Sequence, residues 1–299
     1  MTVTGPVAAD RLGVTLPHEH IFINMLREYR GDGFVADEGL ATSEVAAFWA
    51  AGGGTIVDVT TIGLWRKPEA LRRISETTGV KIVMGTGYYR ELYQDRPALD
   101  RASVNQLADG LVRDIEVGID GTDVRAGIIG ELACDEWLTA IEERCFRAAA
   151  RAHLQTGLTL STHAARWPVG LAQLDLFESE GVDPGRVIVG HCDLVADPDY
   201  HLAVARRGAW VQFDCIQGRL DHETKQAVGY VLALLEAGFS DRILLSHDVC
   251  LRSNLAALGG CGYTYVPTGF RDELLAAGVL EAMVDGFLID NPRRALTGT

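Results

Sequence analysis

Long apolar runs are absent from this sequence. No stretch approaches the roughly 20 consecutive apolar residues that a membrane-spanning helix needs. The first residues, 1–6, also lack the basic and apolar regions of a signal peptide. We therefore expect a cytoplasmic protein that does not cross a membrane.

Closely spaced cysteines are missing as well. The six cysteines are scattered without a CxxC pair, at Cys134, Cys145, Cys192, Cys215, Cys250 and Cys261. In a reducing compartment, isolated cysteines are usually buried thiols rather than disulfide partners. A zinc site built from cysteine is therefore not expected.

Basic residues are fewer than acidic residues in this sequence. The chain has 27 Lys and Arg against 41 Asp and Glu, which gives a formal net charge of −14. Because nucleic-acid affinity depends largely on Lys and Arg that neutralise phosphates, this balance argues against DNA, RNA and anionic membranes as partners. A small-molecule substrate is the expected partner.

The sequence does contain a large apolar fraction in a regular order. Hydrophobic residues make up 47% of the 299 residues, enough for a substantial core. Short runs rich in valine and isoleucine alternate with longer segments at helical spacing. Strands are expected at residues 14–20, 55–60, 80–85, 126–131, 159–163, 186–191, 209–214 and 242–248. Helices are expected at 43–51, 68–77, 105–118, 138–156, 170–180, 200–207 and 222–237.

This order favours an α/β fold, a (β/α)₈ TIM barrel. The expected strands are continuously apolar, as in a parallel sheet covered on both faces, and eight βα units fit the chain length. A doubly wound sheet is the alternative, but residues 85–87 lack the third glycine and the acidic partner of a dinucleotide site. No linker divides the chain, so residues 1–299 are expected to form one domain, with loops 63–67, 88–100 and 251–268 shaping a pocket.

Polar residues gather where the expected strands end. They are His18 and His20 on the first strand, Glu131 on the fourth, His163 on the fifth, His191 on the sixth and Asp248 on the eighth. The C-terminal ends of barrel strands carry the active site. Because strand side chains alternate, His18 and His20 must point to the same side. Buried polar groups are costly unless they are paired or bind metal, so this group predicts a metal centre.

The ligand types favour two divalent ions. Imidazoles and carboxylates without thiolates suit Zn²⁺ first, then Mn²⁺, Co²⁺ or Fe²⁺, and six ligands exceed what one catalytic zinc takes. The simplest division gives His18, His20 and Asp248 to a deeper ion, His163 and His191 to an outer ion, and Glu131 to both. Two ions would acidify a bridging water for attack on a carbonyl or phosphoryl centre, which predicts a hydrolase.

Several motifs resemble those of one known family. Residues 12–20, LGVTLPHEH, look like the N-terminal signature of the phosphotriesterase family of the amidohydrolase superfamily, and similar stretches occur at 126–131, 162–163, 189–193, 211–214, 246–248 and 291–292. The resemblance covers essentially the whole chain. It implies metal ligation by His18, His20, His163, His191 and Asp248, with Asp248 also accepting the proton of the attacking water. Members of this family are often homodimers, so a dimer is expected.

The bridging ligand departs from the commonest family pattern. Phosphotriesterases and many related lactonases use a carboxylated lysine, whereas the three lysines of this chain, Lys67, Lys81 and Lys225, all lie away from the end of the fourth strand. Glu131 would supply an unmodified carboxylate, as in the branch called phosphotriesterase homology proteins. Glu131 and Asp248 are thus the expected catalytic residues. We expect a lactone or carboxyl ester as substrate first, an N-acyl amide second and a phosphotriester last.

Four residues are further candidates for substrate binding. Tyr88 and Tyr89 follow the third strand, where lactonase relatives place an aromatic residue over the reacting carbonyl. Arg166 and Arg252 could pair with a substrate carboxylate or phosphate. Loop anchoring by the tyrosines and solvation of the arginines are the competing interpretations. His247 should point away from the lumen and is left out of the site.

Other acids and histidines receive structural interpretations. Asp58, Asp193 and Asp214 lie near strand ends and could either orient metal-bound imidazoles or cap helices. Three histidines fall in helix candidates and are expected at the surface: His153, His201 and His222.

Three other functions compete with a binuclear hydrolase. A mononuclear deaminase needs a glutamate near the fifth-strand or sixth-strand ligand, where this chain has Ala-Ala-Arg and Cys-Asp-Leu. A metal-containing small-molecule binding protein is the non-enzymatic alternative, and the intact ligand set argues against it. A Schiff-base aldolase needs a lumen lysine, which none of the three lysines supplies.

Overall fold

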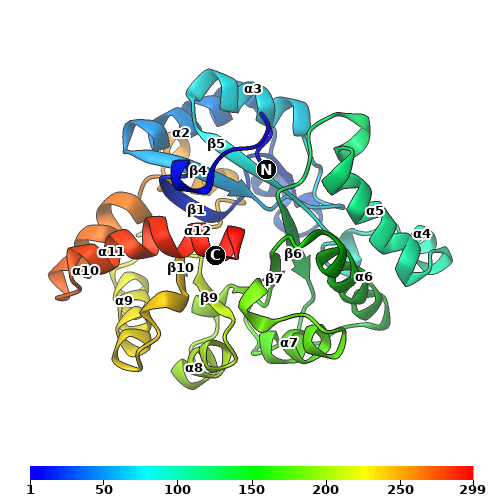
Figure 1. The fold of residues 1–299 in the computed structure, drawn as a ribbon. Helices are drawn as coiled ribbons and strands as arrows, with labels where there is room; N and C mark the ends of the chain where they lie inside the picture. The colour runs from blue at the N-terminus through cyan, green and yellow to red at the C-terminus, as the bar shows by residue number, and fades with distance from the viewer. Residues whose placement is uncertain (299) are drawn as a thin grey trace.

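The computed structural model describes residues 1–298. Its main feature is a sheet of eight strands in the order β1-β4-β5-β6-β7-β8-β9-β10, with every neighbouring pair parallel. The strands are β1 (Val14–Glu19), β4 (Gly53–Asp58), β5 (Lys81–Thr86), β6 (Ile128–Ala133), β7 (Leu160–His163), β8 (Val187–Gly190), β9 (Trp210–Phe213) and β10 (Ile243–Leu245). Figure 1 shows helices around these strands, so the expected TIM barrel is confirmed.

Helices connect successive strands on the outside of the barrel. The long ones are α2 (Glu38–Ala50), α3 (Pro68–Thr78), α5 (Val104–Glu116), α6 (Ala140–Thr156), α7 (Gly170–Ser179), α8 (Pro198–Arg206) and α9 (Asp221–Glu236). Shorter ones are α1 (Leu26–Tyr29), α4 (Arg96–Arg101), α10 (Arg271–Ala276), α11 (Glu281–Asp285) and α12 (Asn291–Thr297). No helix within residues 1–298 has both the length and the hydropathy needed to cross a membrane.

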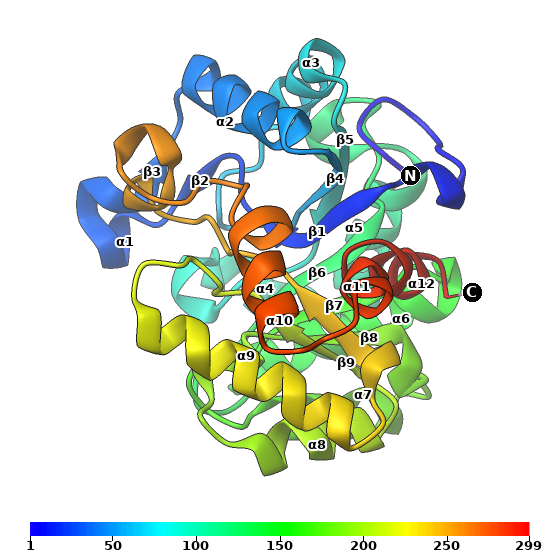
Figure 2. The ribbon, with the colours of Figure 1, turned by 90° about the vertical axis from the view of Figure 1, so that its left-hand side faces the viewer.

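The two ends of the barrel differ. Figure 2 shows the chain termini at one end and α1 with the small strands β2 (Ile23–Asn24) and β3 (Phe34–Val35) at the other. The second end carries the loops that follow the barrel strands. Function is therefore expected at the end that carries α1.

Capping residues explain where α6 begins and ends. Thr139 and Glu142 form a capping box, in which each side chain accepts a hydrogen bond from the backbone N–H of the other. The helix ends at Gly157, whose φ of 73° is a left-handed conformation that glycine adopts without strain. The prediction for this helix, 138–156, is therefore within two residues of the observed bounds.

A compact apolar cluster fills the barrel below the site. Its members come from six strands or their ends and from α12, and they are Val57, Val59, Val83, Ile128, Ile188, Trp210, Leu244 and Ala295. Side chains from strands all around the sheet can contact one another only inside the barrel. The lumen is therefore a packed core, with α12 against its lower end.

Several strand ends differ from the sequence prediction. Strand β6 continues two residues beyond the expected end, because Leu132 and Ala133 pair with Thr162 and His163 of β7. Glu131 consequently lies within β6 rather than at its end. Strand β10 ends at Leu245, before the site is reached.

Two histidines that were expected at the surface are buried. His153 Nδ1 lies 2.6 Å from the carbonyl of Leu158, and His201 Nε2 lies 2.7 Å from the carbonyl of Cys192. Burial lowers the pKa of both imidazoles, so they act as neutral donors that anchor the adjoining turns. The surface prediction was wrong for these two and right for His222, which is exposed.

Glu19 joins the first and last strands of the sheet. Within residues 1–298 no ladder of backbone hydrogen bonds connects β1 with β10. Instead, the fully buried Glu19 carboxylate accepts hydrogen bonds from Ser246 Oγ at 2.8 Å, from His247 N at 2.9 Å and Nδ1 at 2.8 Å, and from Val249 N at 2.9 Å. His247 Nε2 in turn accepts from Val266 N, so this histidine serves barrel closure.

Replacing Glu19 by alanine should lower the free energy of unfolding by at least ~3 kcal/mol, because four buried donors would lose their acceptor. Urea unfolding would measure the change. Glu236→Ala, at the exposed end of α9, is the control and should change stability by less than about 0.5 kcal/mol. A loss below ~1 kcal/mol for Glu19→Ala would contradict the closure role.

Candidate metal centre

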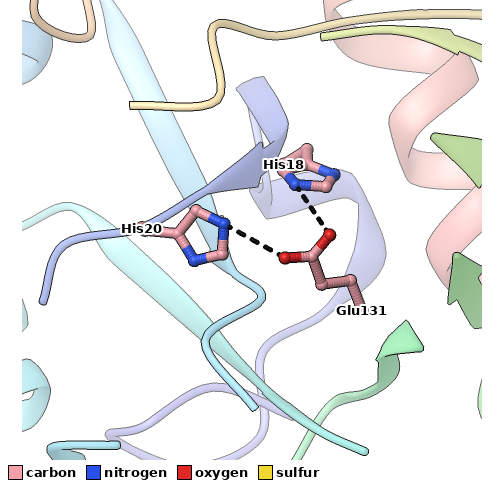
Figure 3. A group of neighbouring side chains, drawn as sticks. All are labelled: His18, His20 and Glu131. Carbon is pink, nitrogen blue, oxygen red and sulfur yellow. Dashed lines mark ion pairs between the residues drawn. The ribbon is translucent and has the colours of Figure 1, made fainter. Parts of the chain in front are cut away.

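The carboxylate of Glu131 lies among four imidazoles. Its Oε2 is 3.1 Å from His163 Nδ1, 3.4 Å from His191 Nε2 and 3.7 Å from His18 Nε2, and its Oε1 is 3.4 Å from His20 Nε2. Figure 3 shows the two contacts to His18 and His20, one from each carboxylate oxygen. One side chain thus faces every histidine that was expected to bind metal.

The ligand atoms fall into two groups that share Glu131. One group is His18, His20 and Glu131, the other is Glu131, His163 and His191, and within each group the ligand atoms lie within 4.8 Å of one another. Asp248 joins the first group, because its Oδ1 lies 3.3 Å from His20 Nε2 and 3.7 Å from His18 Nε2. The structure thus brings together the six residues singled out from the sequence, and their division between two ions stays a prediction.

A hydrogen-bond chain fixes how His20 is oriented. Its Nδ1 lies 2.9 Å from Thr60 Oγ1, and the hydroxyl of Thr60 donates to the carbonyl of Phe22 at 3.0 Å. Since the hydroxyl proton is used, Nδ1 of His20 must donate to Thr60. Nε2 is then the nitrogen that faces Glu131 and Asp248, and it would bind a metal ion after losing its proton.

Asp214 orients two more imidazoles. Its Oδ1 lies 2.7 Å from His191 Nδ1, and its Oδ2 lies 3.2 Å from His18 Nδ1. Gln212 Nε2 lies 2.8 Å from His18 Nδ1 and donates to Oδ2 of Asp214 at 2.7 Å, so it helps to hold His18. Each histidine therefore turns its Nε2 toward Glu131. Of the two interpretations for Asp214, orientation of imidazoles is confirmed.

The other two acids shape the backbone around the site. Asp58 accepts hydrogen bonds from the N–H groups of Ile21 and Thr60, and Asp193 accepts from those of Asp214 and Cys215. In the described part of the chain neither caps a helix or hydrogen-bonds to a ligand imidazole. Both acids hold the loops from which the ligands and their partners project.

The charge of the cluster favours cations. Burial opposes ionisation of Glu131, but hydrogen bonds from His163, His191 and His20 hold the pKa of its carboxyl well below the usual range. Burial likewise lowers the pKa of His20, yet Asp248 and Glu131 outweigh burial and raise it to about 10. Ionised carboxylates thus face imidazoles that hold protons in a buried site, and a divalent cation would replace those protons.

One nitrogen in the cluster is left without a partner. His18 Nε2 is buried and has no hydrogen-bond partner among the described residues, although it points toward Glu131 and Asp248. A buried polar atom in this position is costly unless something binds it. Nitrogen and oxygen donors in two groups with a shared carboxylate fit two divalent ions, so the residues present suit the expected metals.

Local backbone conformation brings two of the ligands into the site. His191 has φ 56° and Asp248 has φ 52°, left-handed values that are uncommon for residues other than glycine. His191 directly follows β8 and Asp248 lies three residues beyond the end of β10, and at both positions the chain turns and brings the side chain to the metal centre. Such strained residues persist when the surroundings fix them, and they concentrate at functional sites.

The centre opens into a cavity of about 130 Å³ that is lined by Tyr89, Arg166 and all the metal-ligand candidates except His18. The Tyr89 ring contacts the His163 ring edge to face at 5.4 Å.

Two weaker candidates fall outside the cavity. Tyr88 directs its hydroxyl to the carbonyl of Leu107 on α5 at 3.1 Å, and Arg252 is exposed beyond the cavity wall. A role in substrate binding is not supported for these two.

A second arginine at the cavity was not predicted from the sequence. Arg90 lines the wall beside Tyr89 and forms ion pairs with Asp135 at 2.7 Å and with Glu28. Its charge is therefore neutralised, whereas Arg166 forms no salt bridge or hydrogen bond within residues 1–298.

Sequence reasoning also missed Gln212 and Thr60. The alternation of Gln212 with Asp214 on one strand face was an available signal.

Comparison with known proteins agrees with this geometry. The model of the phosphotriesterase family matches residues 1–296. The chain belongs to the phosphotriesterase family. It is accordingly a binuclear metal-dependent hydrolase, and its buried cluster of histidines and acids is typical of the metal centre of that family.

Relatives in the family differ in their named activities. The chain is 37% identical to the phosphotriesterase homology protein of Escherichia coli over 285 residues, which cover 95% of this chain and 97% of that one. It is 30% identical to an N-acetyltaurine hydrolase of Tetraodon nigroviridis, covering 99% and 97%. The solved structure of a lactonase from Listeria monocytogenes superimposes with a TM-score of 0.92 at 28% identity, covering 100% and 98%.

The metal content gives a direct test of the shared carboxylate. Purified protein should contain about two divalent ions per chain without added bicarbonate, and a chelator should abolish its activity. Glu131→Gln should retain at most one tightly bound ion, because it removes the charge that faces both groups of ligands. Elemental analysis after dialysis would measure both.

Arg252→Ala is the matched control for this test. Its side chain is exposed outside the cavity, so this variant should keep two ions. Two tightly held ions in Glu131→Gln would show that the bridge lies elsewhere.

Proposed function

We propose that this protein hydrolyses a carboxyl-type bond, with a lactone or carboxyl ester as the preferred substrate and two zinc ions as the native metals. The observation that carries the proposal is the Glu131 carboxylate shared between two groups of metal-ligating residues, beside a small cavity walled by Tyr89. Likeness to a lactonase over the whole chain supports it.

When bound, two divalent ions would supply Lewis acidity and lower the pKa of a water molecule. Asp248 is the residue placed to take the proton, since its side chain is 16% exposed and lines the cavity whereas Glu131 is only 2% exposed. Tyr89 packs against His163 and keeps solvent from that side of the imidazole. The carbonyl to be attacked would lie between the Tyr89 ring and Asp248.

A substrate panel on zinc-loaded protein tests this ordering. Lactones or carboxyl esters should give the highest kcat/KM, N-acyl amides lower values and phosphotriesters the lowest. Chelated protein should be inactive on all of them. The proposal fails if a phosphotriester is turned over with higher kcat/KM than every lactone, ester and amide tested.

An N-acyl amide with an anionic end is the second candidate. Arg166 supports it, because this arginine lines the cavity, is exposed and forms no salt bridge within residues 1–298. Its φ of 68° shows that the backbone there is held in an unusual conformation. Relatives named N-acetyltaurine hydrolase act on an amide with a sulfonate, a group that an arginine binds well.

Arg166→Ala should therefore raise KM for N-acetyltaurine by about tenfold, since a charge-assisted hydrogen bond would be lost at a partly exposed position. KM for an uncharged lactone should change by less than about twofold. Arg252→Ala is the control and should alter neither value. Equal effects of Arg166→Ala on charged and uncharged substrates would contradict recognition of an anion.

A further inference from the structure

Arg90 connects three loops at the catalytic end of the barrel. It follows Tyr89 in the loop after β5. Its Nη1 lies 2.7 Å from Oδ1 of Asp135, in the loop after β6, and its Nη2 pairs with Glu28 on α1. All four side chains line the catalytic cavity. The position of one guanidinium therefore affects the loops after β1, β5 and β6 together.

The same guanidinium contacts two tyrosine rings. Its central carbon lies 5.3 Å from the centre of the Tyr89 ring and 5.5 Å from that of the Tyr93 ring, within the range of cation–π interactions. The two rings contact each other edge to face at 5.3 Å. The Tyr93 hydroxyl donates to Oε2 of Glu28 at 2.6 Å, the oxygen that also accepts from Arg90. Three side chains thus form one connected group beside the Tyr89 ring.

Stability alone does not account for the placement of Arg90. Its side chain is 12% exposed, and its Nε is buried without a hydrogen-bond partner among the described residues. Ordering a long side chain and leaving a buried donor unpaired both cost free energy. Arg96, at the start of α4, instead pairs with Glu91 as an ordinary surface arginine and is 64% exposed. The burial of Arg90 favours a role at the cavity that it lines.

Backbone hydrogen bonds do not fix the direction of the Tyr89 ring. The carbonyl of Tyr89 accepts from Gln94 Nε2 at 3.0 Å, and its N–H donates to the carbonyl of Ile62 at 3.3 Å. These bonds hold the main chain only. The ring itself contacts His163 at 5.4 Å and the guanidinium of Arg90 at 5.3 Å, so its direction depends on these neighbours.

We propose that Arg90 is a positioning residue for Tyr89, which it holds against His163 at the wall of the catalytic cavity. This inference rests on the proposed hydrolysis, in which the reacting carbonyl lies between Tyr89 and Asp248. Because Arg90 acts through the ring, its loss should reduce the fraction of bound substrate that is oriented for attack. Binding itself should change little.

Arg90→Met tests this role, because methionine is long but uncharged. In the zinc-loaded protein, kcat for the best substrate of the panel should fall about tenfold, while KM should change by less than about twofold. The metal content should stay that of the wild-type protein. Arg96→Met is the matched control from the same loop and should leave kcat and KM unchanged.

A double variant distinguishes positioning from a general structural effect. In Tyr89→Ala there is no ring for Arg90 to hold, so adding Arg90→Met should lower kcat by less than about twofold further. An equal fold loss of kcat with and without the Tyr89 ring would overturn the proposal.

A second variant keeps the test decisive if Arg90→Met does not fold. Glu28 is 28% exposed, so the protein should tolerate Glu28→Gln, which removes the charge of one of the two partners of Arg90. Its kcat should fall about threefold, as expected for the weakening of one charge-assisted hydrogen bond. Wild-type kcat in folded Glu28→Gln would then overturn the proposal.

Hydrogen exchange separates this inference from the proposed function. Peptides covering residues 88–94 should exchange faster in Arg90→Met than in the wild-type holoprotein, and at the wild-type rate in Arg96→Met. Faster exchange without turnover of any lactone, ester or amide would retain the role of Arg90 in holding the loop but refute the proposed reaction. Turnover of a lactone with wild-type exchange and wild-type kcat in Arg90→Met would retain the reaction and refute the positioning role.

Discussion

The Glu131 carboxylate is the interaction around which this protein is organised. It is buried inside strand β6 and faces imidazoles from β1, from β7 and from the turn after β8. In a low-dielectric interior, ionised carboxylates need positive charge beside them, which protons on the imidazoles or bound cations can supply. The barrel thus positions one short side chain where two cations can share it, and the surrounding residues maintain that geometry.

Support for the centre comes from the layer of residues behind the ligands. Asp214 holds His18 and His191, and Thr60 holds His20, so these imidazoles present Nε2 to the lumen. Glu19 lies between His18 and His20 in the sequence but bonds to the chain after β10 instead of binding metal. The same short segment therefore closes the barrel and supplies two ligands.

The meeting of the six expected ligands at one site could be predicted from the sequence, because parallel strands bring their C-terminal ends to one rim. The position of Glu131 within β6 could not be predicted from the sequence, because it depends on where β6 stops pairing with β7. The sequence could not distinguish Tyr88 from Tyr89, because both follow the same strand. The path of the loop after β5 directs Tyr89 into the cavity and Tyr88 toward α5. The buried His201 was missed because its partners are carbonyl groups of a turn, which have no side-chain signature.

The cavity at the metal centre is the basis of the proposed selectivity. In the proposed reaction, the carbonyl to be attacked would lie between Tyr89 and Asp248, and the unpaired Arg166 at the cavity wall would bind an anionic substituent. Tyr89 and Arg166 both come from loops that follow barrel strands, and such loops vary independently of the barrel.

Anomalous diffraction from crystals of the zinc-loaded protein would test the central claim most directly. Two peaks should flank the Glu131 carboxylate, one within bonding distance of His18, His20 and Asp248 and the other within bonding distance of His163 and His191. A single peak in fully loaded crystals, or two peaks with Glu131 bound to only one of them, would contradict the account.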